Sequence, residues 1–346
     1  MLKKNLLWLV IVLVVIIAGC TKDKEPAGNS SEGSDGDDRN ENTHTYPFTG
    51  LSADDGGDQR MIGVMVNNHP DARPQTGLSK ADIVFEILAE GRITRFLALY
   101  QSDLPDVVGP VRSAREYYFD LANDYDALYV YHGAANFVED MIQERDIEHL
   151  NGSAYDNDGH LFERDPSREA PHNSYLQMDA VNDVAAEQGY DTTFDYKSLP
   201  FLSEDEAVDG EPASNVEIVY SEQYDFKVGF DYDSKSERYV RTSDGEETID
   251  LDTEEPIGVE NVFVMEAHHE VIDDEGRRSV DMKEGGDAYL FQEGKVQKVE
   301  WKNDDGQIIA MNDGDPVPFV PGQTWVNVVP KDPGLENSVD ISSNAE

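Results

Sequence analysis

The chain has 346 residues, and its 72 Asp and Glu residues against 27 Lys and Arg residues give a formal net charge of −45. This charge argues against binding to nucleic acid, whose phosphates would repel it, and against docking on anionic lipid through a basic patch. We interpret the acid excess as adaptation to high salt, with divalent-cation buffering as the alternative. Because 38% of the residues are hydrophobic, the chain can still build cores, and its length predicts two domains.

Residues 1–19 have the pattern of a secretory signal peptide. Two lysines precede an uncharged apolar run over residues 6–17, which is shorter than the ~20 residues that a membrane-spanning helix needs. The run ends in Ile-Ala-Gly before Cys20, the only cysteine of the chain. Small residues directly before a cysteine are typical of bacterial lipoprotein cleavage, so we expect cleavage there and lipidation of Cys20. The alternative is an uncleaved anchor helix with an incidental cysteine.

Residues 20–50 are predicted to form the lipidated cysteine and a disordered acidic tether. Residues 21–47 contain no Ile, Leu, Val, Met, Phe or Trp, and they are rich in Gly, Ser, Asn and acids. Such a composition cannot offset the entropy of ordering. We therefore expect the folded body to be held on the outer face of the cell membrane, as in Gram-positive bacteria.

An α/β domain is predicted for residues 51–202. Apolar runs at 61–66, 94–100 and 127–131 predict strands, while the run at 81–88 is ambiguous between strand and helix. Helical periodicity predicts helices over 113–123 and 136–145. This alternation of strands and helices is typical of a layered α/β domain.

A smaller, mainly β domain is predicted for residues 214–332, after an acidic stretch at 203–212. Apolar and polar residues alternate over 224–233, which indicates a strand with one buried face. Further strands are predicted at 261–267, 288–292, 295–301 and 324–329. Residues 333–346 are expected to be a flexible tail.

The segment from Gly109 to Glu116 carries the strongest indication of a binding site. Ser113 followed by Glu116 is a capping box, which predicts a helix that begins there, with Arg115 in its first turn and Arg112 just before it. A helix N-terminus already carries partial positive charge, so arginines beside it indicate an anionic partner. We favour a capping role for Ser113 over a role as nucleophile.

These arginines lead to the hypothesis of an anion site that holds a carboxylate or phosphate. The residues assigned to it are Arg95, Arg112, Ser113, Arg115, Arg164 and Asn173. In the alternative interpretation the arginines pair with internal acids such as Glu86 or Glu90. The sequence leaves both open.

His132 and His172 are the candidate catalytic residues. His132 ends a predicted strand before a glycine-containing turn, at the sheet edge where α/β proteins place their sites. His172 follows Pro171 and precedes Asn173. A hydrogen-bonded structural role is the alternative for each. No pair of these residues has metal-ligand spacing, and the chain has no HExxH or CxxC motif, so we predict neither a metal nor a cofactor.

Several stretches together resemble the YerB-like lipoproteins of Gram-positive bacteria. Besides the segment ending in Cys20, they are NHPDARPQTGL at 68–78, ADIVFE at 81–86, ITRF at 93–96, GPVRSAR at 109–115, PHN at 171–173 and PGQTW at 321–325. The resemblance covers residues from about 50 to 330 and implies an N-terminal and a C-terminal domain of unknown function. It supplies no reaction. At YHGAA (131–135) the chain departs from the Gly-Gly-Ser-like turn of the family, which weakens a role for His132.

The leading functional hypothesis is a surface-anchored binding or accessory lipoprotein that recognises an anionic envelope component or an envelope protein. The alternative is a hydrolase or transferase acting on wall glycans or phosphodiester polymers, with His172 or His132 as base and Arg112 and Arg115 as anion clamp. A third possibility is a scaffold with an exposed apolar patch near Trp301 or Trp325.

Overall fold

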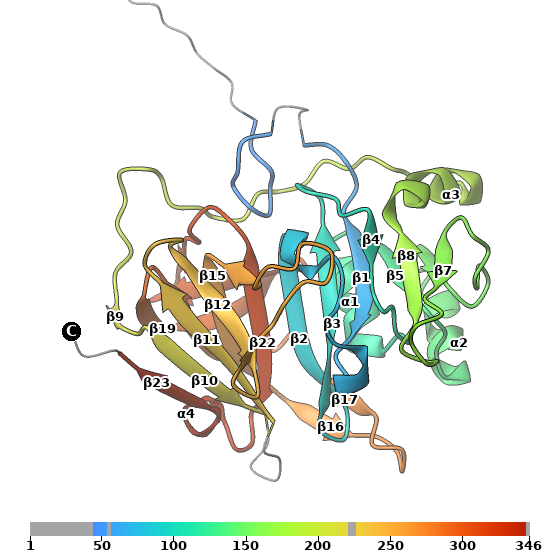
Figure 1. Cartoon of the computed structure of the whole chain (residues 1–346). Helices are drawn as coiled ribbons and strands as arrows, with labels where there is room; N and C mark the ends of the chain where they lie inside the picture. The colour runs from blue at the N-terminus through green and yellow to red at the C-terminus, as the bar shows by residue number, and fades with distance from the viewer. Residues whose placement is uncertain (1–43, 54–56, 221–225, 344–346) are drawn as a thin grey trace, which may run out of the picture. The chain divides into compact units, whose positions relative to one another are not determined.

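The structure is a computed structural model that describes residues 44–53, 57–220 and 226–343 (Figure 1). The predicted signal peptide, the lipidation site Cys20 and the tether up to residue 43 lie outside the described residues. None of the helices in the described ranges has the length and apolar character needed to cross a membrane.

The strands of the N-terminal half form one side of a large mixed sheet. They are β1 (Ile62–Asn67), β2 (Ile83–Glu90), β3 (Ile93–Tyr100), β5 (Leu128–Tyr131) and β6 (His149–Asn151). β3 pairs antiparallel with both β1 and β2, while β5 runs parallel to β1 and β6. The three predicted strands are confirmed, and the ambiguous run at 81–88 is a strand. Its residues are buried on both faces, and this removes the period-2 signal that distinguishes a strand.

Strands of the C-terminal half extend the same sheet. They are β15 (Asn261–Ala267), β18 (Gly286–Gln292), β19 (Lys295–Asp304), β20 (Gln307–Asn312), β21 (Asp315–Val317) and β22 (Thr324–Pro330), with β9 (Glu211–Pro212) paired to β19. The order is β21-β20-β19-β18-β15-β22-β2-β3-β1-β5-β6. β22 pairs in parallel with β2, in a register that places Thr324 opposite Ile83. The two predicted domains therefore share one sheet.

Helices are few, so the N-terminal half fits the predicted α/β class only loosely. They are α1 (Glu116–Asp124), α2 (Asn136–Glu144), α3 (Val181–Gln188) and the short α4 (Leu335–Ser338), with 3-10 turns η1 (Pro70–Ala72), η2 (Leu78–Lys80) and η3 (Met178–Ala180). The β1–β3 and β2–β3 pairs are antiparallel and need no crossover helix, so only the parallel pairs β1–β5 and β5–β6 have a helix, α1 or α2, before the later strand.

Three smaller sheets complete the fold. The six-stranded sheet contains β10 (Asn215–Val219), β11 (Lys227–Asp233), β12 (Arg238–Ser243), β13 (Glu246–Glu247), β14 (Gly258–Val259) and β23 (Val339–Ser342). The others are β4 (Val107–Val108) with β7 (Phe162–Arg164) and β8 (Ser174–Gln177), and the hairpin of β16 (His269–Val271) and β17 (Arg278–Val280). The predicted flexible tail is wrong over 335–342, because β23 pairs with β10.

The two faces of the large sheet pack against different layers. On β2, Ile83, Phe85 and Ile87 belong to the core that α1 covers, whereas Val84 and Leu88 belong to the core shared with the six-stranded sheet. Side chains alternate along a strand, so Glu86 also faces the six-stranded sheet. Figure 1 shows β10, β11 and β12 as a layer beside β22 and β15.

A buried ion pair joins these two layers. Glu86 and Arg241 of β12 are 0% and 1% exposed, and the Arg241 Nη2 atom lies 2.9 and 3.1 Å from the two carboxylate oxygens. Trp325 Nε1 and Thr94 Oγ1 donate to the same carboxylate at 3.0 and 2.9 Å, and Arg241 also donates to Thr248. Each charge is thus neutralised and hydrogen-bonded, which is the condition for burying it.

The tether ends earlier than predicted. Phe48 is fully buried and packs against the rings of Tyr125 and Tyr196 at centroid distances of 5.5 and 5.1 Å. A boundary at residue 50 was therefore too late, because a single aromatic residue anchors the end of a polar stretch.

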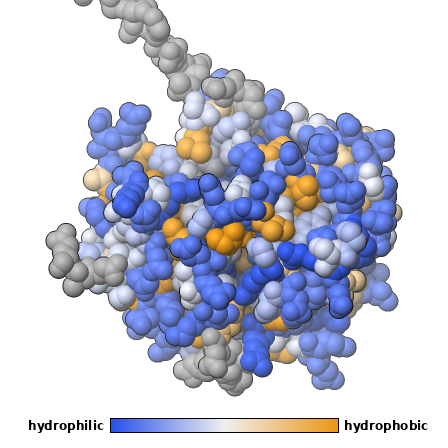
Figure 2. All heavy atoms as spheres, in the orientation of Figure 1, coloured by the Kyte–Doolittle hydropathy of each residue, from blue (hydrophilic) through white to orange (hydrophobic). Residues whose placement is uncertain are grey.

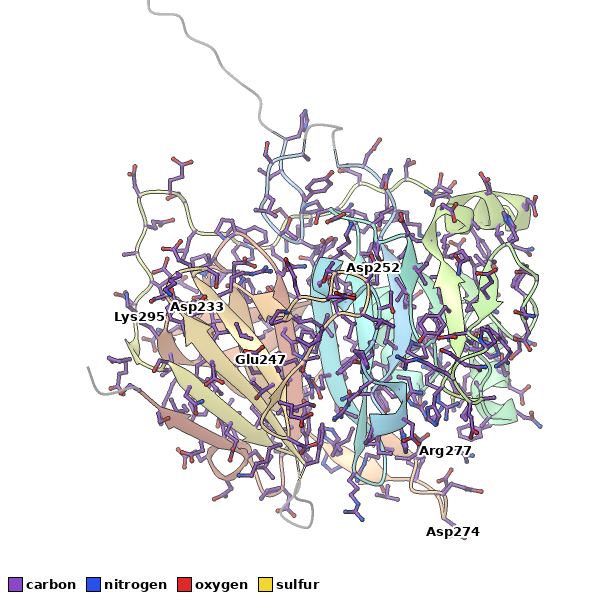
Figure 3. The ribbon with its side chains drawn as sticks, in the orientation of Figure 1. Asp233, Glu247, Asp252, Asp274, Arg277 and Lys295 are labelled. Atoms are coloured by element: carbon purple, nitrogen blue, oxygen red, sulfur yellow. The ribbon has the colours of Figure 1, made fainter. Side chains whose placement is uncertain are left out.

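The surface reflects the acidic composition. Figure 2 shows a mainly hydrophilic face with small, separate apolar patches. The labelled acids Glu247, Asp252 and Asp274 in Figure 3 are exposed, and Asp274 lies at the far end of the β16–β17 hairpin. Trp301 and Trp325 are 2% and 0% exposed, so neither provides the surface patch of the scaffold hypothesis.

Candidate functional site

The segment that carries Arg112 is held by the ends of three strands. Arg112 N–H donates to Met65 of β1 at 2.9 Å, and its carbonyl accepts from His132, which follows β5, at 3.0 Å. The neighbouring Val111 N–H donates to Ser174 of β8 at 2.7 Å. Stretches at 68–78, 109–115, 131–135 and 171–173, which are far apart in the sequence, are thereby brought to one place.

These backbone bonds also explain why the predicted helix start is wrong. Ala114 N–H donates to Gly133 at 3.1 Å, so the chain remains extended to Arg115, which is the N-cap with φ −137° and ψ 154°. α1 begins at Glu116 without a side-chain cap. Ser113 does not cap the helix, and its carbonyl accepts from Arg95 Nη1 at 2.9 Å. Pairing with the strand ends outweighs the local capping signal.

Arg95 and Arg115 do not form an open anion site. They are 6% and 7% exposed, and both pair with the carboxylate of Glu90, Arg95 at 2.8 Å through Nη2. The alternative hypothesis, pairing with an internal acid, is correct for these two residues. Sequence could not decide this, because Glu90 lies on β2 and reaches Arg115 only after folding.

Arg164 and Asn173 are also occupied within the protein. Arg164 Nε donates to Asp156 at 2.6 Å, and its Nη1 donates to the side-chain oxygen of Asn173 at 2.7 Å. Asn173 is 8% exposed and contacts the carbonyls of Asp165 and Arg168. Both residues therefore stabilise the loop before β8.

Arg112 is different from the other predicted arginines. Its guanidinium forms no hydrogen bond or ion pair with any residue in the ranges that the structure describes, although it is half-buried. Burial, together with the nearby charge of Arg95, lowers the pKa of Arg112 to about 10, so it stays charged at neutral pH. A partly desolvated cation without a partner costs free energy that an anionic ligand would recover.

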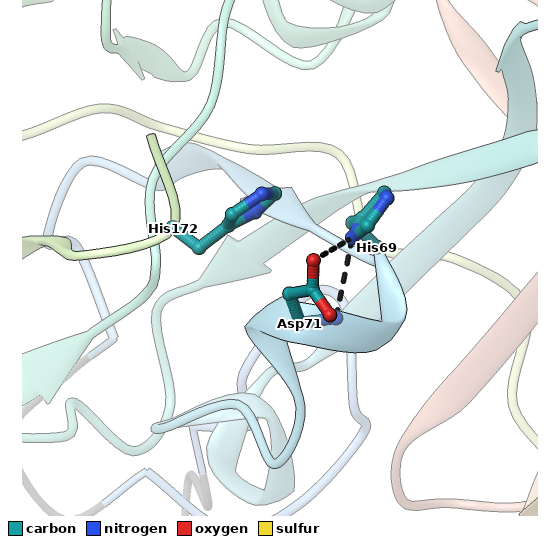
Figure 4. A group of neighbouring side chains, drawn as sticks. All are labelled: His69, Asp71 and His172. Atoms are coloured by element: carbon teal, nitrogen blue, oxygen red, sulfur yellow. Dashed lines mark hydrogen bonds and ion pairs between the residues drawn. The ribbon is translucent and has the colours of Figure 1, made fainter. Parts of the chain in front are cut away.

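His172 lies within electrostatic reach of Arg112 and stacks on His69, which was not among the residues predicted for the site. The rings of His69 and His172 stack with a centroid distance of 4.7 Å and an interplanar angle of 27° (Figure 4). His69 is the N-cap of η1, and its Nδ1 accepts from Asp71 N–H at 3.2 Å. The Asp71 carboxylate lies 3.5 Å from the same nitrogen.

The amide of Asn67 orients both histidines. Its oxygen accepts from the backbone N–H of His69 at 3.0 Å, and its nitrogen lies 2.9 Å from Nδ1 of His172. Because the amide nitrogen is a donor, Nδ1 of His172 is the acceptor and the proton of the neutral ring is on Nε2. Asn67 is 2% exposed, so this arrangement is fixed from inside the protein.

Both candidate bases are neutral at pH 7. Burial lowers the pKa of His172, and His69 and Arg112 lower it further. Burial also lowers the pKa of His132, with the charge of Arg164 contributing. His132 Nδ1 lies 2.8 Å from Ser174 Oγ, but Ser174 is 3% exposed and thus inaccessible as a nucleophile.

His69, Asp71 and His172 each offer one ligand atom, and these atoms lie within 4.8 Å of one another. No metal was predicted, because His132 and His172 lack metal-ligand spacing and the chain has no HExxH or CxxC motif; His69 and Asp71, about a hundred residues before His172, were not among the candidates. His69 and Asp71 do lie in one of the stretches that carry the family resemblance, but an i, i+2 pair alone is no metal signature.

A cavity of about 400 Å³ is lined in part by His69. Asn68, Thr94 and Phe226 are among its lining residues. Arg73 also lines it, with the guanidinium carbon 5.0 Å from the centroid of the Phe226 ring. This cavity can accept the uncharged part of a ligand that also contacts His69.

Comparisons with known proteins agree with the resemblance. Residues 48–191 match the N-terminal domain, and residues 216–326 the C-terminal domain, of a protein of unknown function (DUF3048). A protein of Bacillus subtilis (strain 168) named "Putative lipoprotein YerB" is 44% identical over 286 residues, which are 82% of this chain and 86% of the relative. A crystal structure of the YerB protein from Bacillus subtilis matches with a TM-score of 0.79 at 42% identity, covering 86% of this chain and 99% of that one.

Proposed function

The chain belongs to this two-domain DUF3048 family, and on that premise we propose that it is a lipid-anchored surface protein that binds an anionic component of the cell envelope. Cys20 is the proposed lipidation site, supported by the apolar segment before it and by the name of the relative. Replacing Cys20 with Ala should prevent lipidation. Fractionation should then find the protein in the medium, or as a precursor that keeps residues 1–19.

One observation carries the binding proposal: Arg112 keeps a charged guanidinium half-buried without a partner among the described residues, in a chain of net charge −45. Acids are abundant in this chain, and the other arginines of the predicted site have partners within the protein. Arg95 and Arg115 pair with Glu90, and Arg164 donates to Asn173. An arginine left unpaired in such a chain is best explained by an external anion.

Arg168 adds a second donor near the same place. Its Nη2 donates to the carbonyl of Pro74 at 2.8 Å and its Nε lies 3.9 Å from the Asp165 carboxylate, whereas its Nη1 is buried without a hydrogen-bond partner. The pKa of His172 is lowered mainly by burial, then by His69 and Arg112. The charge of Arg168 makes a smaller contribution in the same direction. Two guanidinium groups and the Nε2–H donor of His172 suit a phosphate or carboxylate.

The test measures binding of short poly(glycerol phosphate) and of soluble muropeptides to the full chain in detergent. We expect Arg112→Ala to weaken binding of the preferred probe at least tenfold. Arg145→Ala is the matched control, because Arg145 is an exposed arginine already paired with Asp120 and Glu116. Measurements at about 1 M salt shorten the Debye length to ~3 Å and remove the general field of the acidic surface. Failure of both probes to bind, or equal binding by the Arg112 variant, would contradict the proposal.

A second candidate is hydrolysis or transfer on the bound polymer with His172 as general base. It is favoured by a neutral imidazole within electrostatic reach of the Arg112 cation, although Nδ1 must give up its contact with Asn67 before the ring can accept a proton. Mass spectrometry of the same polymers after incubation tests it. Products that form with the unchanged chain and disappear with His172→Ala would support an enzyme, and intact polymers would leave binding alone.

A further inference from the structure

We propose that His69, Asp71 and His172 form a binding site for a divalent transition-metal ion of the zinc class. Two imidazoles and one carboxylate are the ligand set of several zinc sites in which a fourth position stays open. The proposal depends on this side-chain cluster and is independent of the anion-binding role of Arg112.

The cluster needs only a small adjustment to hold an ion. Its ligand atoms lie within 4.8 Å of one another, whereas two ligands at ~2.1 Å from one zinc ion lie at most ~4.2 Å apart. The Asp71 side chain is 73% exposed and the His69 side chain 35% exposed, so both can turn without disturbing the core. Figure 4 shows the two rings and the carboxylate facing one another.

The backbone around the cluster is built to hold it. His69 and Asp71 stand on η1, where Pro70 occupies the first position and the His69 side chain caps the turn. His172 comes from the segment before β8, whose Ser174 carbonyl is fixed by Val111. Asn67, which contacts both histidines, acts as a positioning residue that sets the ring orientations.

The same contacts predict a moderate affinity. Nδ1 of His172 already accepts from Asn67, and Nδ1 of His69 accepts from Asp71 N–H. An ion must therefore replace these contacts, either by binding Nδ1 directly or by binding Nε2 after the ring proton has moved to Nδ1, where the present donor must turn away. With three protein ligands and this cost, zinc should bind less tightly than at a closed four-ligand site.

An ion at this place would lie within electrostatic reach of Arg112, with a position open to an exogenous ligand. A metal-bound anion that also contacts a guanidinium is held by two positive groups, as in many phosphate-binding sites. The expected occupant of the open position is therefore water or an oxyanion.

The test is calorimetric titration of Zn²⁺ into the full chain, prepared without a histidine tag and stripped with EDTA. Excess Mg²⁺ and high salt are present throughout, because the acidic surface offers oxygen ligands that Mg²⁺ fills while imidazoles prefer zinc. We expect one site per chain, and we expect Co²⁺ to give a visible absorption band of a nitrogen- and oxygen-ligated site.

His69→Ala, Asp71→Asn and His172→Ala should each weaken zinc binding at least tenfold, with melting temperatures checked to show intact folding. His268→Ala is the matched control, since His268 is exposed at the end of β15. Arg112→Ala should retain zinc binding. Anion binding is measured separately with EDTA present, so that the two proposals can fail independently. No stoichiometric zinc binding, or equal losses in the His268 control, would overturn the proposal.

Discussion

Arg241 and Arg112 show two opposite ways in which this acidic chain uses an arginine. Arg241 is 1% exposed, bonded to both oxygens of Glu86, and its guanidinium carbon lies 4.9 Å from the ring centroid of Trp325. Arg112 is half-buried and has no partner in the described part of the chain. The first arginine completes the fold, whereas the second remains available for a ligand.

Arg95 and Arg115 lie between these extremes and show why counting charges was insufficient. The sequence suggested one anion site that included four arginines, yet Arg95 and Arg115 are neutralised by Glu90 from a neighbouring strand. The distinction depends on which carboxylates the sheet brings within reach. A functional arginine is therefore identified by its lack of a partner after folding rather than by its neighbours in sequence.

The largest expected effect comes from breaking the buried pair. Arg241→Leu leaves the Glu86 carboxylate buried without its cation, so the free energy of unfolding should fall by about 3–5 kcal/mol. Denaturant unfolding measures this loss. The double variant Glu86→Gln with Arg241→Leu should recover a large part of it, and a loss below about 1 kcal/mol in the single variant would show that the pair is not needed.

Asp82 sharpens the comparison, because it is a buried carboxyl whose hydrogen bonds come from Ser102 rather than from a cation. Burial raises the pKa of Asp82 from 3.8 to about 7, only partly offset by these hydrogen bonds. The folded state therefore holds a proton that the unfolded state loses between pH 4 and 7. The contribution of Asp82 to stability is present below about pH 4 and is lost as the pH rises to about 7.

The variant Asp82→Asn should remove this pH dependence, which is on the order of 4 kcal/mol at most. Its unfolding free energy should change less between pH 4 and 7 than that of the unchanged protein. Denaturant unfolding at a series of pH values measures this difference. Parallel pH profiles for the two proteins would show that Asp82 does not titrate in this range.

The smallest expected effect on stability is that of Arg112→Ala. Because the guanidinium has no internal partner, its removal should change the unfolding free energy by less than about 0.5 kcal/mol or raise it slightly. The same denaturant measurement made for Arg241→Leu provides the direct contrast. A loss of 2 kcal/mol or more would place Arg112 among the structural arginines.

The sequence predicted local features well. Apolar runs such as 61–66 and 261–267 are strands, because a strand buried on both faces needs an unbroken apolar segment. The start of α1 was placed too early, since bonds to β1 and the β5 turn keep the backbone extended. A capping signal of about 1 kcal/mol does not outweigh several such bonds.

Contacts between distant segments could not be predicted. The pairing of Arg241 with Glu86 and the meeting of His172 with His69 join residues more than a hundred positions apart. Only the register of the sheet brings them together, and no single stretch encodes it. For the same reason Arg112, which the sequence identified together with Arg95 and Arg115, could be separated from them only by the structure.

The parallel pairing of β2 with β22 also constrains how the molecule is made. A strand near residue 85 receives its neighbour from residues 324–330, about 240 residues later in the chain. Until then β2 has an unpaired edge, and Glu86 lacks the indole donor of Trp325. The family's N-terminal half is therefore incomplete by itself, and a fragment that stops after residue 202 should be sensitive to protease and prone to aggregation. Nearly the whole polypeptide must therefore be available before this central pairing of the sheet can form.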